Sequence, residues 1–270
     1  MESISHAPAE SSSSSASSTQ HKIWMEAQDE LKQKLIAQDD FPWRSATTAP
    51  PTSDQEEKAL KYVGGVDISY SKELPSMACG TLVVLDIHSL QVVYEDYSVL
   101  TLSVPYGPGF LAFREAPVLL ELLEKMKAGA NLFYPQLLMV DGNGILHPRG
   151  KSFDTNPCAI HACHFVNEAK LHHVDGLTLS GVRQLLKAKE DCAEDFINLT
   201  GRSGHIWGVA MRSTDGSVKP IFISIGHRIS LDTAIKIVKL TCKYRVPEPI
   251  RQADIRSREY LRKHQAMINK

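Results

Sequence analysis

Gln136-Leu-Leu-Met-Val-Asp-Gly-Asn-Gly144 decides the fold, because it predicts a buried strand that ends in a glycine-rich turn. A short run without a polar residue, here Leu137 to Val140, is typical of a strand buried on both faces of a parallel sheet. Asp141 ends that strand, and the glycines after it allow the backbone to approach a ligand closely. The stretch therefore predicts a central strand of an α/β sheet with a carboxylate at its end.

Three strand candidates precede this stretch in quick succession. Their close spacing, with a hairpin at His88-Ser89, predicts an antiparallel meander. A helix with apolar side chains at helical spacing then leads to the strand at 136–140. This order predicts a meander followed by a parallel crossover, which gives a mixed sheet flanked by helices. The predicted strands are Tyr62–Ser69, Ala78–Ile87 and Gln91–Leu102, and the predicted helix is Ala112–Lys127.

The two ends of the chain add further elements. An amphipathic helix is predicted over residues 22–38, followed by a loop at 45–57. Toward the C-terminus, two strands are predicted to pair and two helices to follow them. Their ranges are Gly208–Arg212 and Ile221–Ile225 for the strands, and Leu231–Tyr244 and Glu248–His264 for the helices. We expect one catalytic domain over residues 22–265.

The first twenty residues differ in composition from the rest. Ser11 to Ser18 form an almost unbroken serine run with nothing to bury, so residues 1–20 are expected to be disordered. They carry no Arg, no Lys and no apolar run, which fits neither a secretory signal nor an Arg-rich transit peptide. No window of the chain is apolar enough for a transmembrane helix, so no membrane partner is expected.

Charge and cysteine content point to a reduced protein with a basic C-terminal end. The five cysteines form no CxxC pair, which favours an intracellular protein without disulfides. Residues 1–60 hold ten Asp and Glu against five Lys and Arg, whereas residues 243–270 hold eight Lys and Arg against three Asp and Glu. That basic end is either a surface for nucleic-acid phosphates or an ordinary solvated helix.

Three carboxylates are candidates for one metal site. Asp67 follows an apolar strand just after Gly64-Gly65, and Asp141 follows another. If the two strands are neighbours, both carboxylates lie at the same edge of the sheet, and Glu115 enters from the start of a helix. Three carboxylates in one desolvated site repel one another, and Mg²⁺ relieves that repulsion while it binds phosphate oxygens. The alternative is that both aspartates only begin turns.

Four further residues are candidates with plain structural alternatives. His147 could orient water or protonate a leaving oxygen, and Arg149 could bind phosphate or cap a helix. His227, between a strand and a helix, is a second candidate acid or base. Tyr106 lies between Pro105 and Gly107-Pro-Gly109. A rigid exposed tyrosine of this kind either stacks on bases or covers its own turn.

Taken together, these motifs resemble those of endonuclease V, a family that nicks nucleic acid near deaminated adenine (inosine). The resemblance covers roughly residues 22–150 and 171–262. It is carried, in order, by Val63-Gly-Gly-Val-Asp67, the Pro105-Tyr106 loop, Phe113-Arg-Glu115, Val140-Asp-Gly-Asn-Gly-Ile-Leu-His-Pro-Arg149, Val174-Asp-Gly-Leu177, Gly226-His-Arg228 and Pro247-Glu-Pro-Ile-Arg-Gln-Ala-Asp254.

The resemblance implies an RNase H-like fold with a Mg²⁺ site, for which Mn²⁺ is a substitute. It implies that Tyr106 wedges into the strand, and that the hypoxanthine base lies in a pocket lined by backbone after Asp141. The implied metal ligands are Asp67, Glu115 and Asp141. The other implied catalytic residues are His147, Lys170 and His227, and the implied substrate contacts are Tyr106, Gly107, Gly142, Asn143, Gly144 and Arg149.

The family's reaction is also implied. Its members cut the second phosphodiester bond 3′ to inosine and leave 3′-hydroxyl and 5′-phosphate ends. The sequence does not choose between DNA and RNA, and therefore between DNA repair and processing of inosine-containing RNA. A monomer is the default expectation, in the nucleus, the cytoplasm or both.

Residues 151–170 depart from the family pattern. No run of β-branched residues lies between His164 and Leu171, so we expect the family's inner strand to be missing and Lys170 to lose its support. The rival hypothesis is therefore an inert RNase H-like protein that only binds nucleic acid. A third hypothesis is a zinc-stabilised module, although a second well-spaced ligand pair is lacking. Its ligands would come from Cys158, His161, Cys163, His164, His172 and His173.

Overall fold

A computed structural model of the chain describes residues 11–43, 59–102, 110–142, 144–146, 161–166, 175–188, 195–214 and 219–268, with the backbone alone for 11–18, 161–166 and 268. The strands are β1 (Tyr62–Tyr70), β2 (Met77–Asp86), β3 (Val92–Thr101), β4 (Leu137–Asp141), β5 (His161–Val166), β6 (Phe196–Thr200), β7 (Ile206–Met211) and β8 (Ile221–Ser224). The helices are α1 (Ser11–Gln33), α3 (Leu111–Ala128), α4 (Leu179–Ala188), α5 (Leu231–Thr241) and α6 (Glu248–Ile268), with a short 3-10 helix, η1 (Gly144–Leu146).

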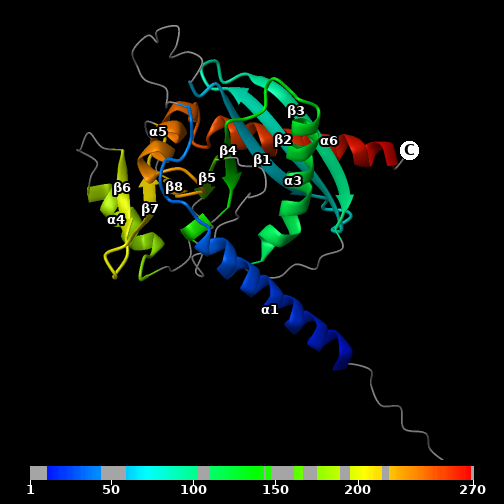
Figure 1. Ribbon diagram of the computed structural model, residues 1–270, viewed down its shortest axis with the longest axis horizontal. Coiled ribbons are helices and arrows are strands. Elements are labelled where there is room, and N and C mark those ends of the chain that lie inside the picture. Colours follow the sequence, from blue (N-terminus) through cyan, green and yellow to red (C-terminus); the bar gives the residue numbers. More distant parts are fainter. Residues whose placement is uncertain are drawn as a thin grey trace, which may run out of the picture.

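The strands form one eight-stranded sheet in the order β3-β2-β1-β4-β5-β8-β7-β6. The central strands β1, β4 and β5 are parallel neighbours. All other neighbouring strands are antiparallel, including the meander β1-β2-β3. Figure 1 shows this twisted sheet with helices packed against it. The mixed sheet confirms the predicted α/β, RNase H-like fold class.

Strand β5 corrects one expectation from the sequence. The lack of β-branched residues before Leu171 predicted that no inner strand would form, whereas His161–Val166 is a strand. It pairs with β4 on one side and with β8 on the other. Strand propensity depends on neighbours more than on the residue itself, so two flanking ladders compensate for a sequence that would not form a strand alone. The sheet therefore keeps its inner strand.

Helices cover both faces of the sheet. A Cβ atom on Gly80 of β2 would lie 3.0 Å from the Val118 side chain, so α3 packs closely on one face. On the other face, a Cβ atom on Gly65 of β1 would lie 2.1 Å from the carbonyl oxygen of Pro249 in α6. Only glycine fits at Gly65, because two backbones meet there. The start of α6 is thus fixed against the middle of β1.

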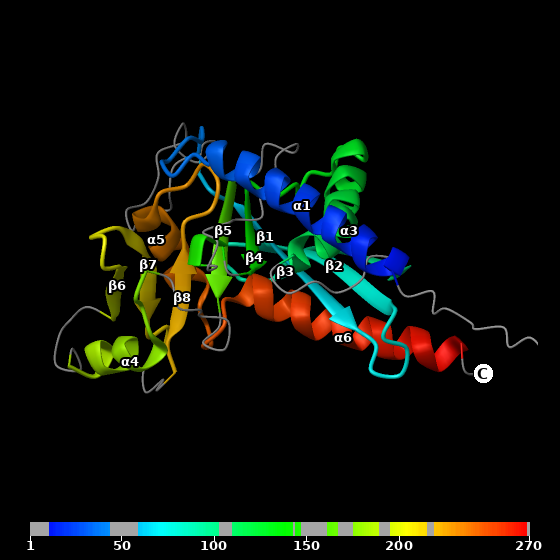
Figure 2. The same ribbon diagram turned by 90° about the horizontal axis from the view of Figure 1, so that it is seen from below.

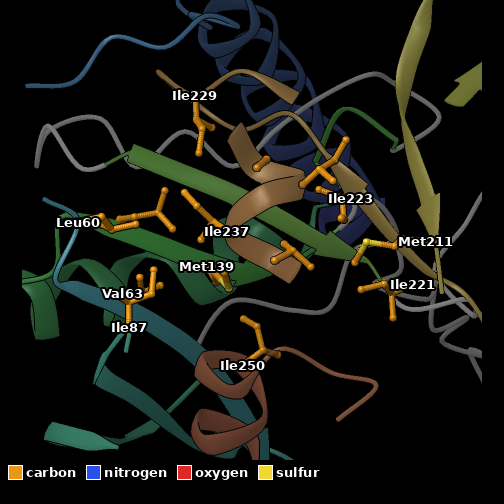
Figure 3. Close-up of a cluster of buried hydrophobic side chains, with 14 of the residues drawn as sticks. Leu60, Val63, Ile87, Met139, Met211, Ile221, Ile223, Ile229, Ile237 and Ile250 are labelled. Carbon is orange, nitrogen blue, oxygen red and sulfur yellow. The ribbon is translucent and has the colours of Figure 1, made fainter. Parts of the chain in front are cut away.

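Two hydrophobic cores lie on opposite faces and share strand β4. Leu137 and Met139 belong to the core under α5, in which Ile237 and Ile223 are also buried (Figure 3). The intervening residues Leu138 and Val140 belong to the core under α3. Since successive residues of a strand point to opposite faces, β4 is buried on both sides, as its apolar sequence predicts.

Helix α1 begins earlier than the sequence predicts. It starts at Ser11, so it includes the serine run that we expected to be disordered. Serine is only a moderately poor helix former, and an established helix adds residues at little cost. Figures 1 and 2 show α1 extending from the body of the molecule at its N-terminal end. Residues 1–10 and the predicted loop at 45–57 lie outside the described residues.

Helix α4 and strand β6 were also not predicted. Both are short, ten residues for α4 and five for β6, so each offers only a brief stretch of pattern. They pack together with η1 around Leu146 and Phe222, which are completely buried. Within the described part of the chain, no helix is both long and apolar enough to cross a membrane.

Candidate active site

Asp67 and Asp141 lie side by side at one edge of the sheet. The parallel register of β1 and β4 pairs Gly65 with Met139 and Val66 with Val140. One step further along both strands are the two aspartates, and neighbouring strands are about 4.8 Å apart. This is the arrangement that the sequence predicts if the two strands are neighbours.

Both aspartates share the face that α6 covers. Ser257 of α6 donates a hydrogen bond from Oγ to Asp67 Oδ2 over 2.8 Å. Asp141 is two residues beyond Met139, which lies in the core under α5 on this same face. Because side chains alternate along a strand, the Asp141 carboxylate projects to the face that carries α5 and α6.

A short chain of hydroxyls orients Asp67. Ser257 is completely buried, and its Oγ lies 2.6 Å from Ser69 Oγ. A hydroxyl has one hydrogen, and a charged carboxylate is the stronger acceptor. Ser257 therefore donates to Asp67 and accepts from Ser69. Ser257 was not among the predicted site residues, because only the packing of α6 on β1 reveals its position.

Helix α6 also brings Asp254 and Arg258 near Asp67. Arg258 Nε donates to Asp254 Oδ1 over 2.8 Å, one helical turn away. This hydrogen bond, followed by the charges of Asp254 and Asp67, raises the pKa of Arg258 above its usual value. The spacing of residues 254, 257 and 258 places all three on one helix face. The i,i+4 spacing of Asp254 and Arg258 is the signal in the sequence that could have found this pair, whereas Ser257 has no such signal.

Glu115 is held close to the same end of β1 by Tyr70. The Tyr70 hydroxyl donates to Glu115 Oε1 over 2.8 Å, and the Arg114 guanidinium lies 5.3 Å from the centre of the Tyr70 ring. Burial, then the charge of Glu115, raises the pKa of Tyr70 far above its usual value, and the charge of Asp67 acts in the same direction. The phenol therefore stays protonated and remains a donor. It lies within electrostatic range of two of the predicted carboxylates.

The three predicted carboxylates are not gathered into a closed cluster. Within the residues that the structure describes, no three His, Cys, Asp or Glu side chains form a ready-made metal site. Asp67 and Asp141 are neighbours, whereas Glu115 is bound to Tyr70. The carboxylate oxygens of these residues are ligands of the type that Mg²⁺ prefers, and Mg²⁺ needs only one or two protein carboxylates.

An aromatic cluster fixes the helix that carries Glu115. The rings of Trp24 in α1 and Phe113 in α3 are stacked with centroids 5.6 Å apart. Phe110, just before α3, lies 5.4 Å from Trp24 and 5.2 Å from His21. Trp24 and Phe110 are both buried. Helix α1 therefore supports the first turn of α3, two residues from Glu115.

The turn after Asp141 is anchored by the buried residues Gly144 and Leu146. Gly142 is half-buried, and Gly144 is buried with φ +50°, a left-handed conformation that favours glycine. Leu146 then inserts completely into the core of α4, β6 and β7. Several other predicted site residues lie outside the described residues, namely Tyr106, Gly107, Asn143, His147, Arg149 and Lys170.

His227 lies at the opposite end of the sheet from Asp141. Strand β8 is antiparallel to β5, with Ser224 opposite His164, so the chain leaving β8 runs back toward the start of β4 (Figure 2). There His227 is buried, and its Nδ1 accepts a hydrogen bond from Ile36 N over 3.4 Å. The structure does not bring His227 to the carboxylates. The prediction from sequence failed because it did not include the direction of β8.

The sequence also matches a known protein family. The sequence profile of the family described as Endonuclease V matches residues 46–255 of the chain. The chain belongs to the endonuclease V family. It is therefore an endonuclease, a hydrolase of phosphodiester bonds.

Relatives in this family cover most of the chain. Endonuclease V from mouse is 40% identical over 242 residues, which are 89% of this chain and 69% of the mouse protein. Endonuclease V from human is 40% identical over 242 residues, which are 89% of this chain and 83% of the human protein. The family assignment thus rests on sequence along nearly the whole domain.

Solved structures of endonuclease V share the fold. The catalytic domain of human Endonuclease V has a TM-score of 0.80 at 37% identity, covering 92% of this chain and 98% of that one. Ciona intestinalis Endonuclease V, in complex with a 24mer DNA containing an inosine followed by a ribo-adenosine, has a TM-score of 0.79 at 31% identity, covering 91% and 99%.

Proposed function

We propose that the chain is a Mg²⁺-dependent endonuclease that cuts nucleic acid at inosine. The observation that carries the proposal is the β1–β4 register, which places Asp67 beside Asp141 at one sheet edge. The Ciona intestinalis relative bound to inosine-containing DNA supports inosine as the base that is recognised. We assign the cut to the second phosphodiester bond 3′ to inosine, with 3′-hydroxyl and 5′-phosphate ends, in DNA, RNA or both.

Asp67 and Asp141 are the residues that would hold the metal ion, with Glu115 as the third carboxylate. Two neighbouring carboxylates repel each other, and that repulsion favours a bound cation. Mg²⁺ is usually bound by one or two carboxylates together with substrate phosphates and water, and Mn²⁺ accepts the same oxygen ligands. When bound, the ion supplies neutralisation of phosphate charge and activation of water.

The protein's own contribution is to fix these carboxylates in position. Ser257 holds Asp67 by a hydrogen bond, and Tyr70 holds Glu115 by another. The ring of Tyr70 is itself covered by the Arg114 guanidinium. Fixed acceptors lose little entropy when they bind a cation or position a phosphate, so this support favours catalysis.

The proposal is tested with the purified chain and an end-labelled oligonucleotide that contains one inosine. In the presence of Mg²⁺ we expect a nick at the second bond 3′ to inosine, and none in the matched strand with adenosine or without divalent ions. Ribose and deoxyribose versions of the strand separate RNA from DNA activity. Binding without any nick, in Mg²⁺ and in Mn²⁺, would overturn the proposal.

That negative outcome is what the rival hypothesis of an inert binding protein predicts. The rival was based on an inner strand that was expected to be missing. Strand β5 is present and paired on both sides, which removes that part of the reason, whereas Lys170 lies outside the described residues.

A further inference from the structure

The connection between α5 and α6 presents an exposed tyrosine with two cations near its ring. The side chain of Tyr244 is 50% exposed, although it is large and aromatic. The Arg251 guanidinium lies 4.5 Å from the centre of its ring, and the Lys243 ammonium lies 5.9 Å from it. We call these three side chains the Tyr244 platform. An aromatic ring with cations beside it is the combination that binds single-stranded nucleic acid.

The platform is rigid because a buried carboxylate holds Arg251. Glu248, only 3% exposed, accepts from Arg251 Nε over 2.8 Å and from Arg251 Nη2 over 3.1 Å. Gln252 adds a third hydrogen bond to Glu248, over 3.0 Å. A bidentate pair of this kind fixes the plane of the guanidinium. The guanidinium in turn fixes the Tyr244 ring that it covers.

The platform lies close to the carboxylate edge. At the end of α5, Thr241 Oγ1 lies 3.9 Å from the sulfur of Met139, two residues before Asp141. At the start of α6, Pro249 meets the backbone of Gly65, two residues before Asp67. Figure 2 shows the connection from α5 to α6 passing beside the ends toward which β4 and β5 point.

The charge of this segment suits a polyanion. Residues 243–251 contain the cations Lys243, Arg245 and Arg251, and a single carboxylate, Glu248. That carboxylate is buried and paired with Arg251, so Lys243 and Arg245 determine the charge that a ligand meets. The Arg245 backbone is fixed, because its carbonyl accepts from Ser213 Oγ over 2.7 Å.

We propose that the Tyr244 platform binds the nucleic-acid strand next to the cleavage position, with one base stacked on Tyr244 and adjacent phosphates bound by Lys243 and Arg245. The inference rests on the proposed function and adds to it a second contact with the strand, distinct from the carboxylates. Stacking on an aromatic ring does not depend on which base is present, so this contact grips the strand without selecting inosine.

The test measures binding of a fluorescent single-stranded inosine oligonucleotide by anisotropy, with EDTA present so that cleavage does not occur. Tyr244→Ala should weaken binding about tenfold, because one base loses its stacking partner. Tyr244→Phe should bind like the wild type, since the ring remains. Leu132→Ala, which changes a residue that is 89% exposed before the start of β4, is the control and should have no effect.

The charge contacts are tested by salt dependence. Lys243→Ala should lower the slope of log K against log salt by about one, because one phosphate contact is lost. Lys127→Ala removes an exposed lysine at the far end of α3 and should leave the slope unchanged. Equal slopes for the wild type and Lys243→Ala would argue against phosphate contact at the platform.

The outcomes separate this inference from the proposed function. A wild type that binds strands but never cuts at inosine contradicts the function and leaves the binding measurement intact. A wild type that cuts, together with Tyr244→Ala that binds equally well, overturns the platform. Tyr244→Trp provides a second readout, because its added indole fluorescence should be quenched when a strand binds. Absence of quenching beyond that of the wild type counts against stacking.

Discussion

The hydroxyl of Tyr70, the last residue of β1, donates a hydrogen bond to Glu115 Oε1 across 2.8 Å. The strand that carries Asp67 is thus linked by a hydrogen bond to the Glu115 carboxylate of α3. This hydrogen bond holds the Glu115 carboxylate in position in the free protein.

Tyr70→Phe should therefore weaken the response to Mg²⁺ without unfolding the protein. The phenyl ring keeps its packing, and only the bond to Glu115 is lost, which is worth about 1–2 kcal/mol for a charged acceptor. We expect the Mg²⁺ concentration for half-maximal cutting to rise roughly tenfold. Calorimetric titration of Mg²⁺ should show the same shift, and an unchanged titration would contradict the role of Tyr70.

Asp141→Asn should abolish cutting and spare binding. The variant loses a carboxylate beside Asp67 but no cation that contacts phosphate, so strands should bind at least as tightly. Cutting should fall on the order of a hundredfold or more, because even outer partners of a metal ligand cost 10–100-fold. The control is Asp40→Asn, since Asp40 pairs with Arg228 near His227, away from the carboxylates. Equal loss in both variants would indicate a general effect of charge.

Trp24→Ala should loosen the start of α3. Trp24 is only 8% exposed and packs on Phe113, so its removal should lower the free energy of unfolding by about 3 kcal/mol in urea titrations. Ile23→Ala is a matched control, because Ile23 is the preceding residue and is 52% exposed. We expect less than about 0.5 kcal/mol for that change. Similar losses for both would show that α1 does not pack as described.

Gly65→Ala should destabilise the protein more than Gly204→Ala. The added Cβ would lie 2.1 Å from Pro249 O, and neither backbone can move without shifting α6 on β1. We expect a loss above about 3 kcal/mol, the upper range for overpacking. Gly204→Ala is the comparison, since a Cβ there meets nothing within 4 Å and only its φ of +82° is unfavourable. Equal unfolding midpoints for the two variants would refute the close approach.

Glu248→Gln should make stability less sensitive to acid. Burial opposes the charge of Glu248, but hydrogen bonds from Arg251 and Gln252 outweigh it and lower the pKa below 4.5. A group with a lowered folded-state pKa stabilises above its unfolded pKa, and that contribution is lost as the pH falls through the folded value. Between pH 6 and pH 3 the wild type should therefore lose more stability than Glu248→Gln.

The control for this experiment is Glu259→Gln. Glu259 is an exposed partner of Lys263 on the same helix, and its pKa is lowered by that hydrogen bond. Exposed pairs are screened by water and contribute little. The acid dependence of the control should match that of the wild type, and any flattening equal to that of Glu248→Gln would weaken the assignment to Glu248.

The sequence was sufficient to predict the core of the fold. Periodic spacing of apolar residues predicts strands β1 to β3 and helix α3. The apolar run Leu137–Val140 correctly indicates that β4 is a strand buried on both faces. Asp67 and Asp141 could be placed together because parallel neighbours end at one edge. Local pattern and sheet geometry are enough for these statements.

The remaining features depend on tertiary contacts that no local pattern contains. Strand β5 lacks a strand-like sequence, and it is paired with a strand on each side. His227 was expected near the carboxylates, yet the direction of β8 places it elsewhere. The role of Ser257 follows only from the packing of α6 on β1, since a serine in a basic helix carries no signal by itself.

The backbone contact between Gly65 and Pro249 leaves no room for sliding between the strand that carries Asp67 and the helix that begins beside Tyr244. If the Tyr244 platform and the carboxylates act on the strand as proposed, they act on it at one constant separation. A nucleic-acid strand bound at both sites then has a fixed number of nucleotides between them. The scaffold then sets the position of the cut relative to the base that stacks on Tyr244, whichever base that is.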